Sequence, residues 1–162
     1  MEFMTLKAIF KQLFSFLALS VFSFSASAGI MLSEGHVRAM PASVPNTAAY
    51  LTLMNHSDDA VTLVSVTTPV AEEAQLHTLV EENGMVKMRQ VEGFDIPSHG
   101  TLKLQPSGDH IMLLSLTKPL TIGDKVPLVL TFKDGQTLAI ELVVEKRSNN
   151  DTQESNHHHH HH

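Results

Sequence analysis

Two hairpin signals constrain the fold of this chain more than any other feature of its sequence. Asn83-Gly84 and Asp134-Gly135 each lie between short runs of aliphatic and β-branched residues. Both dipeptides tolerate the positive φ angles of a tight two-residue turn, which joins neighbouring antiparallel strands. The other apolar runs are also short, are separated by turn residues and lack the 3.6-residue repeat of a helix. The sequence therefore predicts an all-β domain.

At least eight short strands are predicted. So many strands, without a convincing long helix, favour an antiparallel sandwich or barrel. The one competitor for a helix is the short segment 70–76. The predicted strands are residues 48–54, 61–67, 75–80, 85–91, 101–104, 110–116, 125–132 and 136–144.

Both ends of the chain carry segments outside the predicted fold. Residues 157–162 are six histidines, which form an affinity tag. The polar residues 148–156 predict a disordered tail. Met1-Glu2-Phe3 resembles a cloning scar in front of a second start at Met4.

Residues 4–28 have the pattern of a secretory signal peptide. Two lysines give a positive start, residues 13–24 are apolar and uncharged, and Ala26-Ser27-Ala28 supplies the small residues of a cleavage site. The apolar run is shorter than the roughly 20 residues needed to span a bilayer. We therefore predict a cleaved signal, a periplasmic location without a membrane span, and one mature domain over residues 29–147.

The composition narrows the chemistry that this domain can perform. The chain has no cysteine, so it has no disulfide and no thiolate that could act as a nucleophile or a metal ligand. Its formal net charge of −6 argues against nucleic acid or an anionic membrane surface as a partner. Any metal ligands must therefore come from His, Met, Asp and Glu.

Strand geometry places four possible metal ligands in two pairs. Residues two apart in a strand share a face, so His110 and Met112 project together. Pairing across the first hairpin turn places Leu79 opposite Met88. His77 and Met88 then lie on one face as diagonal neighbours, within reach for long side chains.

The methionines decide which metal this set would select. Thioether sulfur is soft and uncharged, so methionine beside imidazole favours Cu(I) over hard ions such as Mg²⁺ or Ca²⁺. For any single residue a structural role is the simpler interpretation, because methionine fills cores and isolated histidines sit on surfaces. Taken from the residues alone, a copper site and a structural role both remain open.

The spacing of the four residues matches a known family. His77, ten residues, Met88, twenty-one residues and then His110-Ile111-Met112 resemble the His-x10-Met-x21-His-x-Met motif of the periplasmic Cu(I) chaperones called the PCu(A)C family. The resemblance extends over essentially the whole mature domain. It includes Arg38-Ala39-Met40-Pro41, Ala48-Ala49-Tyr50-Leu51-Thr52-Leu53, Met85-Val86-Lys87-Met88-Arg89, Ile96-Pro97, Gly108-Asp109-His110-Ile111-Met112-Leu113 and Leu128-Val129-Leu130-Thr131-Phe132.

This resemblance implies a fold, a cargo and a function. Members of the family adopt a cupredoxin-like Greek-key β-sandwich and carry Cu(I) in the periplasm, where they help to load the copper centres of cytochrome oxidase. We therefore expect one Cu(I) ion per monomeric domain, passed to an oxidase copper subunit or to another periplasmic copper protein. The expected ligands are His77, Met88, His110 and Met112.

The chain departs from the family at several positions. Many relatives have methionine where Leu79 stands and an aromatic residue where His36 stands, so this chain loses one possible ligand and gains another. Some relatives also carry a C-terminal extension rich in Met and His, which residues 148–156 do not match. The remaining candidates, interpreted as loop, core or surface residues, are His56, His99, Met31, Met40, Met54 and Met85.

The sequence also bears on function classes other than a copper chaperone. An electron-transfer cupredoxin needs a cysteine thiolate, and the chain has none. No nucleophile elbow, phosphate loop or dinucleotide motif is present, so the sequence does not predict an enzyme. A copper buffer or resistance protein with no dedicated acceptor stays open, because the same site would serve it. An adhesion or structural sandwich without metal also stays open.

Overall fold

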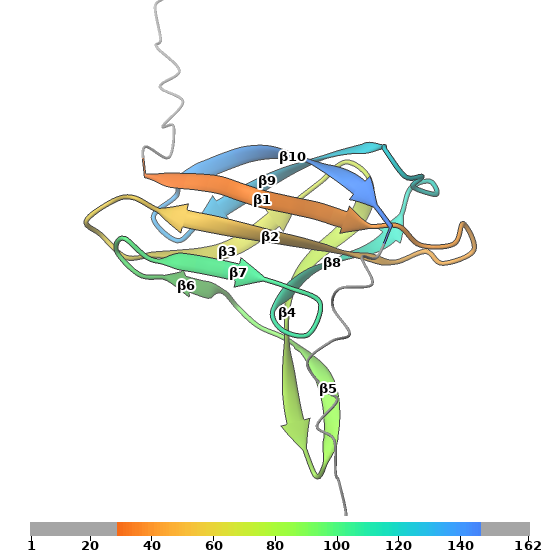
Figure 1. Ribbon diagram of the computed structural model, residues 1–162, viewed down its shortest axis with the longest axis horizontal. Coiled ribbons are helices and arrows are strands. Elements are labelled where there is room, and N and C mark those ends of the chain that lie inside the picture. Colours follow the sequence, from red (N-terminus) through yellow and green to blue (C-terminus); the bar gives the residue numbers. More distant parts are fainter. Residues whose placement is uncertain (1–28, 147–162) are drawn as a thin grey trace, which may run out of the picture.

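The computed structural model describes residues 29–146, so the predicted signal, scar, tail and tag lie outside the described residues, as does Arg147. The described part is all-β, as predicted, and no helix in it could cross a membrane. Ten strands follow one another in the chain (Figure 1). They are β1 (Ile30–Arg38), β2 (Thr47–Asn55), β3 (Val61–Thr67), β4 (Ala71–Glu82), β5 (Met85–Gln90), β6 (Phe94–Ile96), β7 (Thr101–Leu104), β8 (His110–Leu116), β9 (Lys125–Phe132) and β10 (Thr137–Glu145).

The strands form one hydrogen-bonded path that folds back on itself as a sandwich. Its order is β5-β4-β8-β2-β1-β10-β9-β3-β6. Strand β7 lies off this path and pairs with the second half of β2, whereas β8 pairs with the first residues of β2. The predicted cupredoxin-like sandwich is confirmed. One pair differs from the predicted antiparallel pattern, because β1 and β10 run parallel to each other.

The sequence analysis did not predict β1 and β6, and in each case the reason is local. In β1 a register shift between Leu32 and Glu34 interrupts the alternation of apolar and polar residues. β6 has only three residues, which is too short for a periodic signal. The segment that competed as a helix, 70–76, instead belongs mostly to β4, which pairs with β8 along its first half.

The core lies between the two layers and explains their packing. Leu51 and Ile111 come from β2 and β8, whereas Leu130 and Phe132 come from β9, and all four are buried in one apolar cluster. Such a cluster supplies most of the free energy of folding for a domain without disulfides. On β8 the buried Ile111 and its alternating neighbours fix the opposite face, which carries the candidate site.

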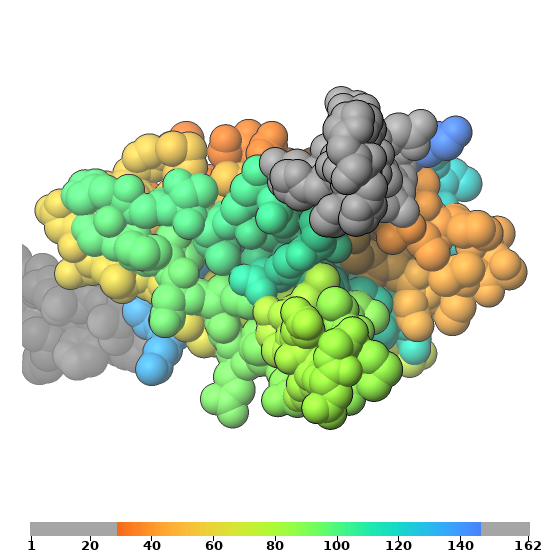
Figure 2. All heavy atoms as spheres, turned by 60° about the horizontal axis from the view of Figure 1, so that its bottom comes forward, coloured from red at the N-terminus to blue at the C-terminus, as the bar shows by residue number. Residues whose placement is uncertain are grey.

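The hairpin of β4 and β5 projects from the body of the sandwich (Figures 1 and 2). Asn83 and Gly84 form its turn with positive φ angles of 55° and 75°. The register across the turn is the predicted one, with Leu79 opposite Met88. All six residues of β5 are exposed, because β5 is the last strand of the path and pairs with β4 alone. Met88 therefore lies on a projecting arm at the edge of the sheet.

Candidate metal centre

Two of the predicted ligands are direct partners in the sheet. His77 of β4 lies opposite His110 of β8, and the centroids of their rings are 5.8 Å apart at an interplanar angle of 62°. His110 is 4% exposed, and His77 is half-buried. Because paired residues in an antiparallel ladder share a face, both rings project from the same side of the sheet.

A tight turn fixes the position of His110 at the first residue of β8. The turn is closed by a bond from Gln105 N to Asp109 O of 2.8 Å, and Thr78 Oγ1 of β4 donates to Asp109 Oδ1 at 2.6 Å. The Nδ1 atom of His110 lies 2.9 Å from the carbonyl oxygen of Gly108. A carbonyl can only accept, so Nδ1 carries the proton and Nε2 keeps a lone pair in the neutral ring.

A second hydrogen-bond chain fixes the opposite tautomer of His77. Gln75 Nε2 donates to Glu73 Oε2 at 2.8 Å, which leaves Gln75 Oε1 as the acceptor 2.9 Å from His77 Nε2. The proton of His77 is therefore on Nε2, and the lone pair is on Nδ1. Nδ1 is buried and has no hydrogen-bond partner. A buried acceptor without a donor is costly, and a metal ion would satisfy it.

Burial also keeps His77 in the form that binds metals. Desolvation lowers the pKa of His77 below its usual 6.5, and the neighbouring His110 lowers this pKa further. A neutral imidazole is the form that coordinates a metal.

The two methionines complete one face of three neighbouring strands. Met112 lies opposite Gln75 of β4, and Met88 lies opposite Leu79 of the same strand. Met88 is 59% exposed, while Met112 is half-buried. A cavity of about 230 Å³ is lined by His110, Met112 and Met88, together with Arg38, Met40, Asn46, Thr47, Ala48, Tyr50, Leu79 and Pro106. His77 is not in this lining, and its ring lies beside the cavity against that of His110.

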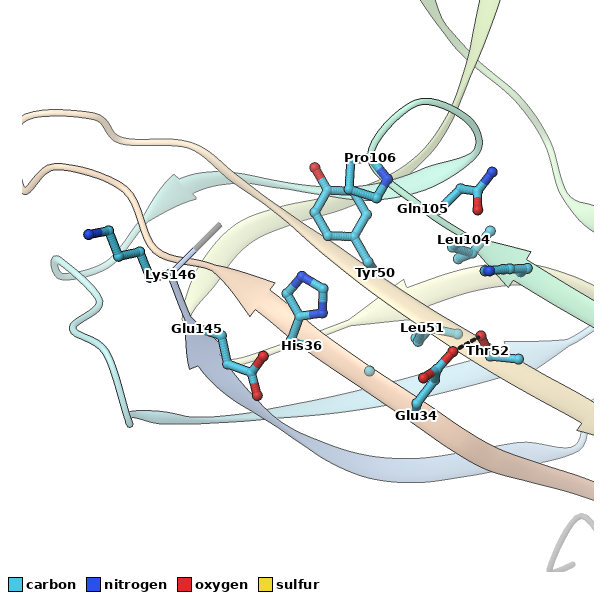
Figure 3. A pocket seen from close by; sticks show the side chains of 12 residues that line it. Glu34, His36, Tyr50, Leu51, Thr52, Leu104, Gln105, Pro106, Glu145 and Lys146 are labelled. Carbon is cyan, nitrogen blue, oxygen red and sulfur yellow. Dashed lines mark hydrogen bonds between the residues drawn. The ribbon is translucent and has the colours of Figure 1, made fainter. Parts of the chain in front are cut away.

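The departure at His36 falls outside this group of ligands. His36 is the partner of Tyr50 across β1 and β2, with ring centroids 5.3 Å apart, and Tyr50 is 6.4 Å from His110. His36 lines a separate cavity of about 430 Å³, where its ring lies between Tyr50 and Glu145 (Figure 3). The Tyr50 ring thus separates His36 from the histidine pair.

The other candidates are surface residues, apart from Met40. His56 and His99 are exposed, and His99 pairs with Asp58 at 2.8 Å. Met31, Met54 and Met85 are 59%, 38% and 58% exposed. Within residues 29–146, no group of three or more His, Cys, Asp or Glu side chains could hold a metal ion. The methionines that line the cavity beside the histidine pair are Met40, Met88 and Met112.

The four predicted ligands, His77, Met88, His110 and Met112, form a donor set without charge. Two imidazole nitrogens and two thioethers carry no charge, and hard cations prefer carboxylate and carbonyl oxygens. The four residues stay a prediction as ligands, and the sequence analysis did not anticipate the hydrogen bonds that the histidines make to Gln75 and to the carbonyl of Gly108. Gln75 could have been found, since it is two residues before His77 and so shares its face.

Comparison with known proteins identifies the family. The family described as "LpqE-like: Putative lipoprotein LpqE-like" matches residues 30–144. The chain belongs to the LpqE-like family. It is 36% identical over 118 residues to "Putative lipoprotein Lxx21020" of Leifsonia xyli subsp. xyli, which covers 72% of this chain and 70% of that protein. It is 26% identical over 102 residues to the uncharacterized protein RP573 of Rickettsia prowazekii, of which it spans 56%.

Solved structures connect this LpqE-like chain to copper-binding domains. Apo-DR1885 from Deinococcus radiodurans is 40% identical, with a TM-score of 0.58 over 74% of this chain and 80% of that chain. The Cu(I) form of DR1885 is 42% identical, with a TM-score of 0.57 over 68% and 74%. The copper-bound PCuAC domain of PmoF2, at 18% identity, shares the fold with a TM-score of 0.62 over 74% and 94%. The predicted membership of the PCu(A)C family is confirmed.

Proposed function

We propose that this protein binds one Cu(I) ion through His77, Met88, His110 and Met112 and carries it to another copper protein. The observation that supports this most directly is the state of the two histidines. Each has one ring nitrogen engaged in a hydrogen bond, and each keeps its other nitrogen for a metal, namely Nδ1 of His77 and Nε2 of His110. The two thioethers lie on the same face.

The donor set suits a carrier better than a permanent store. Cu(I) is soft, and neutral thioether and imidazole donors bind it without neutralising its charge. A thiolate acceptor supplies that charge, so transfer of Cu(I) from this site to cysteine ligands is downhill. The protein holds and releases the ion without changing any covalent bond, so the proposed function is not enzymatic.

The proposal also names a compartment and a copper acceptor. We place the protein in the periplasm on the basis of the signal pattern in residues 4–28, and the lipoprotein names of its family and of one relative support export. The proposed acceptor is the copper subunit of cytochrome oxidase, which the family resemblance implies. The Cu(I) form of its relative DR1885 supports the oxidation state of the cargo.

Two experiments test this function. The first is a competition titration of the chain without residues 157–162 against a Cu(I) chelator, because those histidines bind metals themselves. We expect one tight Cu(I) per chain, and failure to compete would refute the site. The second compares a deletion strain with its parent under copper limitation. Reduced copper loading of cytochrome oxidase supports the carrier. Normal loading combined with copper sensitivity would instead identify a buffer or resistance protein.

A further inference from the structure

A fifth residue with a soft donor borders the same cavity as the proposed ligands. Met40 lies in the segment between β1 and β2 and is half-buried. It lines the cavity of about 230 Å³ together with Met88, His110 and Met112. The other methionines with described surroundings, Met31, Met54 and Met85, do not line this cavity and are more exposed than Met40. The position of Met40 is therefore distinct among the methionines outside the proposed ligand set.

The two proposed sulfur ligands are held very differently by the sheet. Met112 lies within β8, which is paired with β4 on one side and with β2 on the other. Met88 lies on β5, an edge strand that pairs with β4 alone and whose residues are all exposed. An incoming acceptor can therefore reach Met88 first. Of the four ligands, Met88 is the one that an acceptor thiolate would displace at the lowest cost.

Met40 belongs to a different part of the fold from Met88. Its segment leaves β1 after Arg38 and is tied to the sheet by a bond from Ala39 N to Glu145 O of 2.7 Å. Thr47 Oγ1 also donates to the carbonyl oxygen of Arg38 at 2.6 Å. Met40 thus borders the cavity from a segment that is hydrogen-bonded to the body of the sandwich and lies outside the β4–β5 hairpin. Leu79 already provides apolar surface on the hairpin side.

We propose that Met40 is a third thioether donor, which replaces Met88 on Cu(I) as the ion leaves the site. The inference rests on the proposed function. In this exchange the bond from copper to Met88 sulfur breaks and a bond to Met40 sulfur forms. No charge or oxidation state changes, because both donors are neutral thioethers. Copper keeps four donors while its outer side becomes open to an acceptor.

A double-mutant cycle tests this exchange in the chain without residues 157–162. The variants are Met40→Leu, Met88→Ala and the two combined, each titrated with Cu(I) against a chelator. Leucine keeps the volume of methionine but offers no donor atom. We expect Met40→Leu alone to change the affinity by less than about threefold. In the Met88→Ala background, Met40→Leu should lower the Cu(I) affinity by about tenfold. A difference of this size lies within the range of interaction energies that double-mutant cycles measure for coupled residues.

A second measurement shows whether Met40 coordinates copper or only packs against the cavity. The methyl groups of the methionines are labelled with ¹³C, and the Met40 signal is identified by its loss in Met40→Leu. In Met88→Ala, Cu(I) should shift this Met40 signal, whereas the signal of Met54 should stay in place. Met54→Leu is the matched control in the titrations, since Met54 is a partly exposed methionine outside the cavity.

The outcomes distinguish this inference from the proposed function. If the double variant binds Cu(I) as tightly as Met88→Ala, or if the Met40 methyl signal does not move, Met40 is not a donor. The proposed function survives that result when the unchanged chain binds Cu(I) and Met112→Ala weakens binding. If the unchanged chain binds no Cu(I), the proposed function fails first and the exchange fails with it.

Discussion

His77 and His110 are direct cross-strand partners whose ring centroids lie 5.8 Å apart on one face of the sheet. At this separation two protonated rings repel each other, and burial of His77 disfavours its protonation further. Two neutral rings with lone pairs on Nδ1 of His77 and Nε2 of His110 instead favour one shared cation. This arrangement supports the proposed role of the pair as ligands of one metal ion.

Removal of both sulfur ligands should remove most of the Cu(I) affinity. We expect Met88→Ala and Met112→Ala together to weaken binding by more than the 10- to 100-fold that loss of an outer partner typically costs. The reason is that both proposed sulfur ligands of the bound state would be lost, which leaves the two imidazole nitrogens and at most the thioether of Met40. A competition titration against a Cu(I) chelator measures the effect. An unchanged affinity would show that these methionines are not ligands, and Met54→Leu serves as the control.

Gln75 should affect copper through the tautomer of His77. Gln75→Leu removes the acceptor for His77 Nε2, so the ring can place its proton on Nδ1 and lose the proposed donor atom. We expect the Cu(I) affinity to fall by about 10- to 100-fold, as for other partners that orient a metal ligand. The ¹⁵N shifts of His77 report the tautomer directly.

The matched control for Gln75→Leu is Gln90→Leu. Gln90 lies on β5 and is the cross-strand partner of His77 in the β4–β5 pair. The hydrogen bond of His77 Nε2 is made to Gln75. Gln90→Leu should leave both the tautomer and the affinity unchanged. Equal losses in the two variants would mean that general disturbance of the sheet, and not the hydrogen bond, lowers the affinity.

Asn55 should be important for stability and not for copper. It is 1% exposed, and its side chain donates to the carbonyl oxygens of Asp59 and Pro97 while it accepts from Ser57. Asn55→Ala removes a buried amide together with its three part-buried hydrogen bonds, so the free energy of unfolding should fall by about 1–3 kcal/mol. Urea denaturation measures this loss. An unchanged midpoint would contradict it, and Cu(I) affinity at 25 °C should stay the same.

Two relationships within the candidate site could be predicted from the sequence, because each depends only on residues that are close together in the chain. The Asn83-Gly84 signal specifies the hairpin, and the hairpin specifies that Leu79 faces Met88. Alternation along β8 similarly places His110 and Met112 on one face. Both relationships need only residues that are close in the chain, and both are confirmed.

The rest of the site depends on pairing between distant segments. That His77 lies opposite His110 depends on the register of β4 against β8, and no turn connects these two strands. Met40 borders the cavity because β1 lies beside β2, and β1 was missed since its register shift hides its alternation. Periodicity within one strand cannot fix such contacts, because it carries no information on which strand comes next in the sheet.

The last prediction concerns pH, which separates the histidines from the methionines. Protons compete with copper for a histidine nitrogen, whereas a thioether does not titrate in this range. Burial and the neighbouring His110 lower the pKa of His77 below 6.5, so competition at His77 begins only below that pH. Cu(I) affinity should therefore be constant at high pH and fall as the pH decreases.

The limiting slope counts the histidines that bind copper. Once both rings of the free protein are protonated, affinity should fall by roughly two decades per pH unit, because two protons must leave for each copper bound. His77→Ala should reduce this slope to about one. Protonation of His77 also destabilises the fold below its unfolded-state pKa of about 6.5, since its folded-state pKa is the lower of the two. Circular dichroism at each pH must therefore show a folded domain. An affinity that stays constant from about pH 8 to about pH 4 would mean that neither histidine is a ligand.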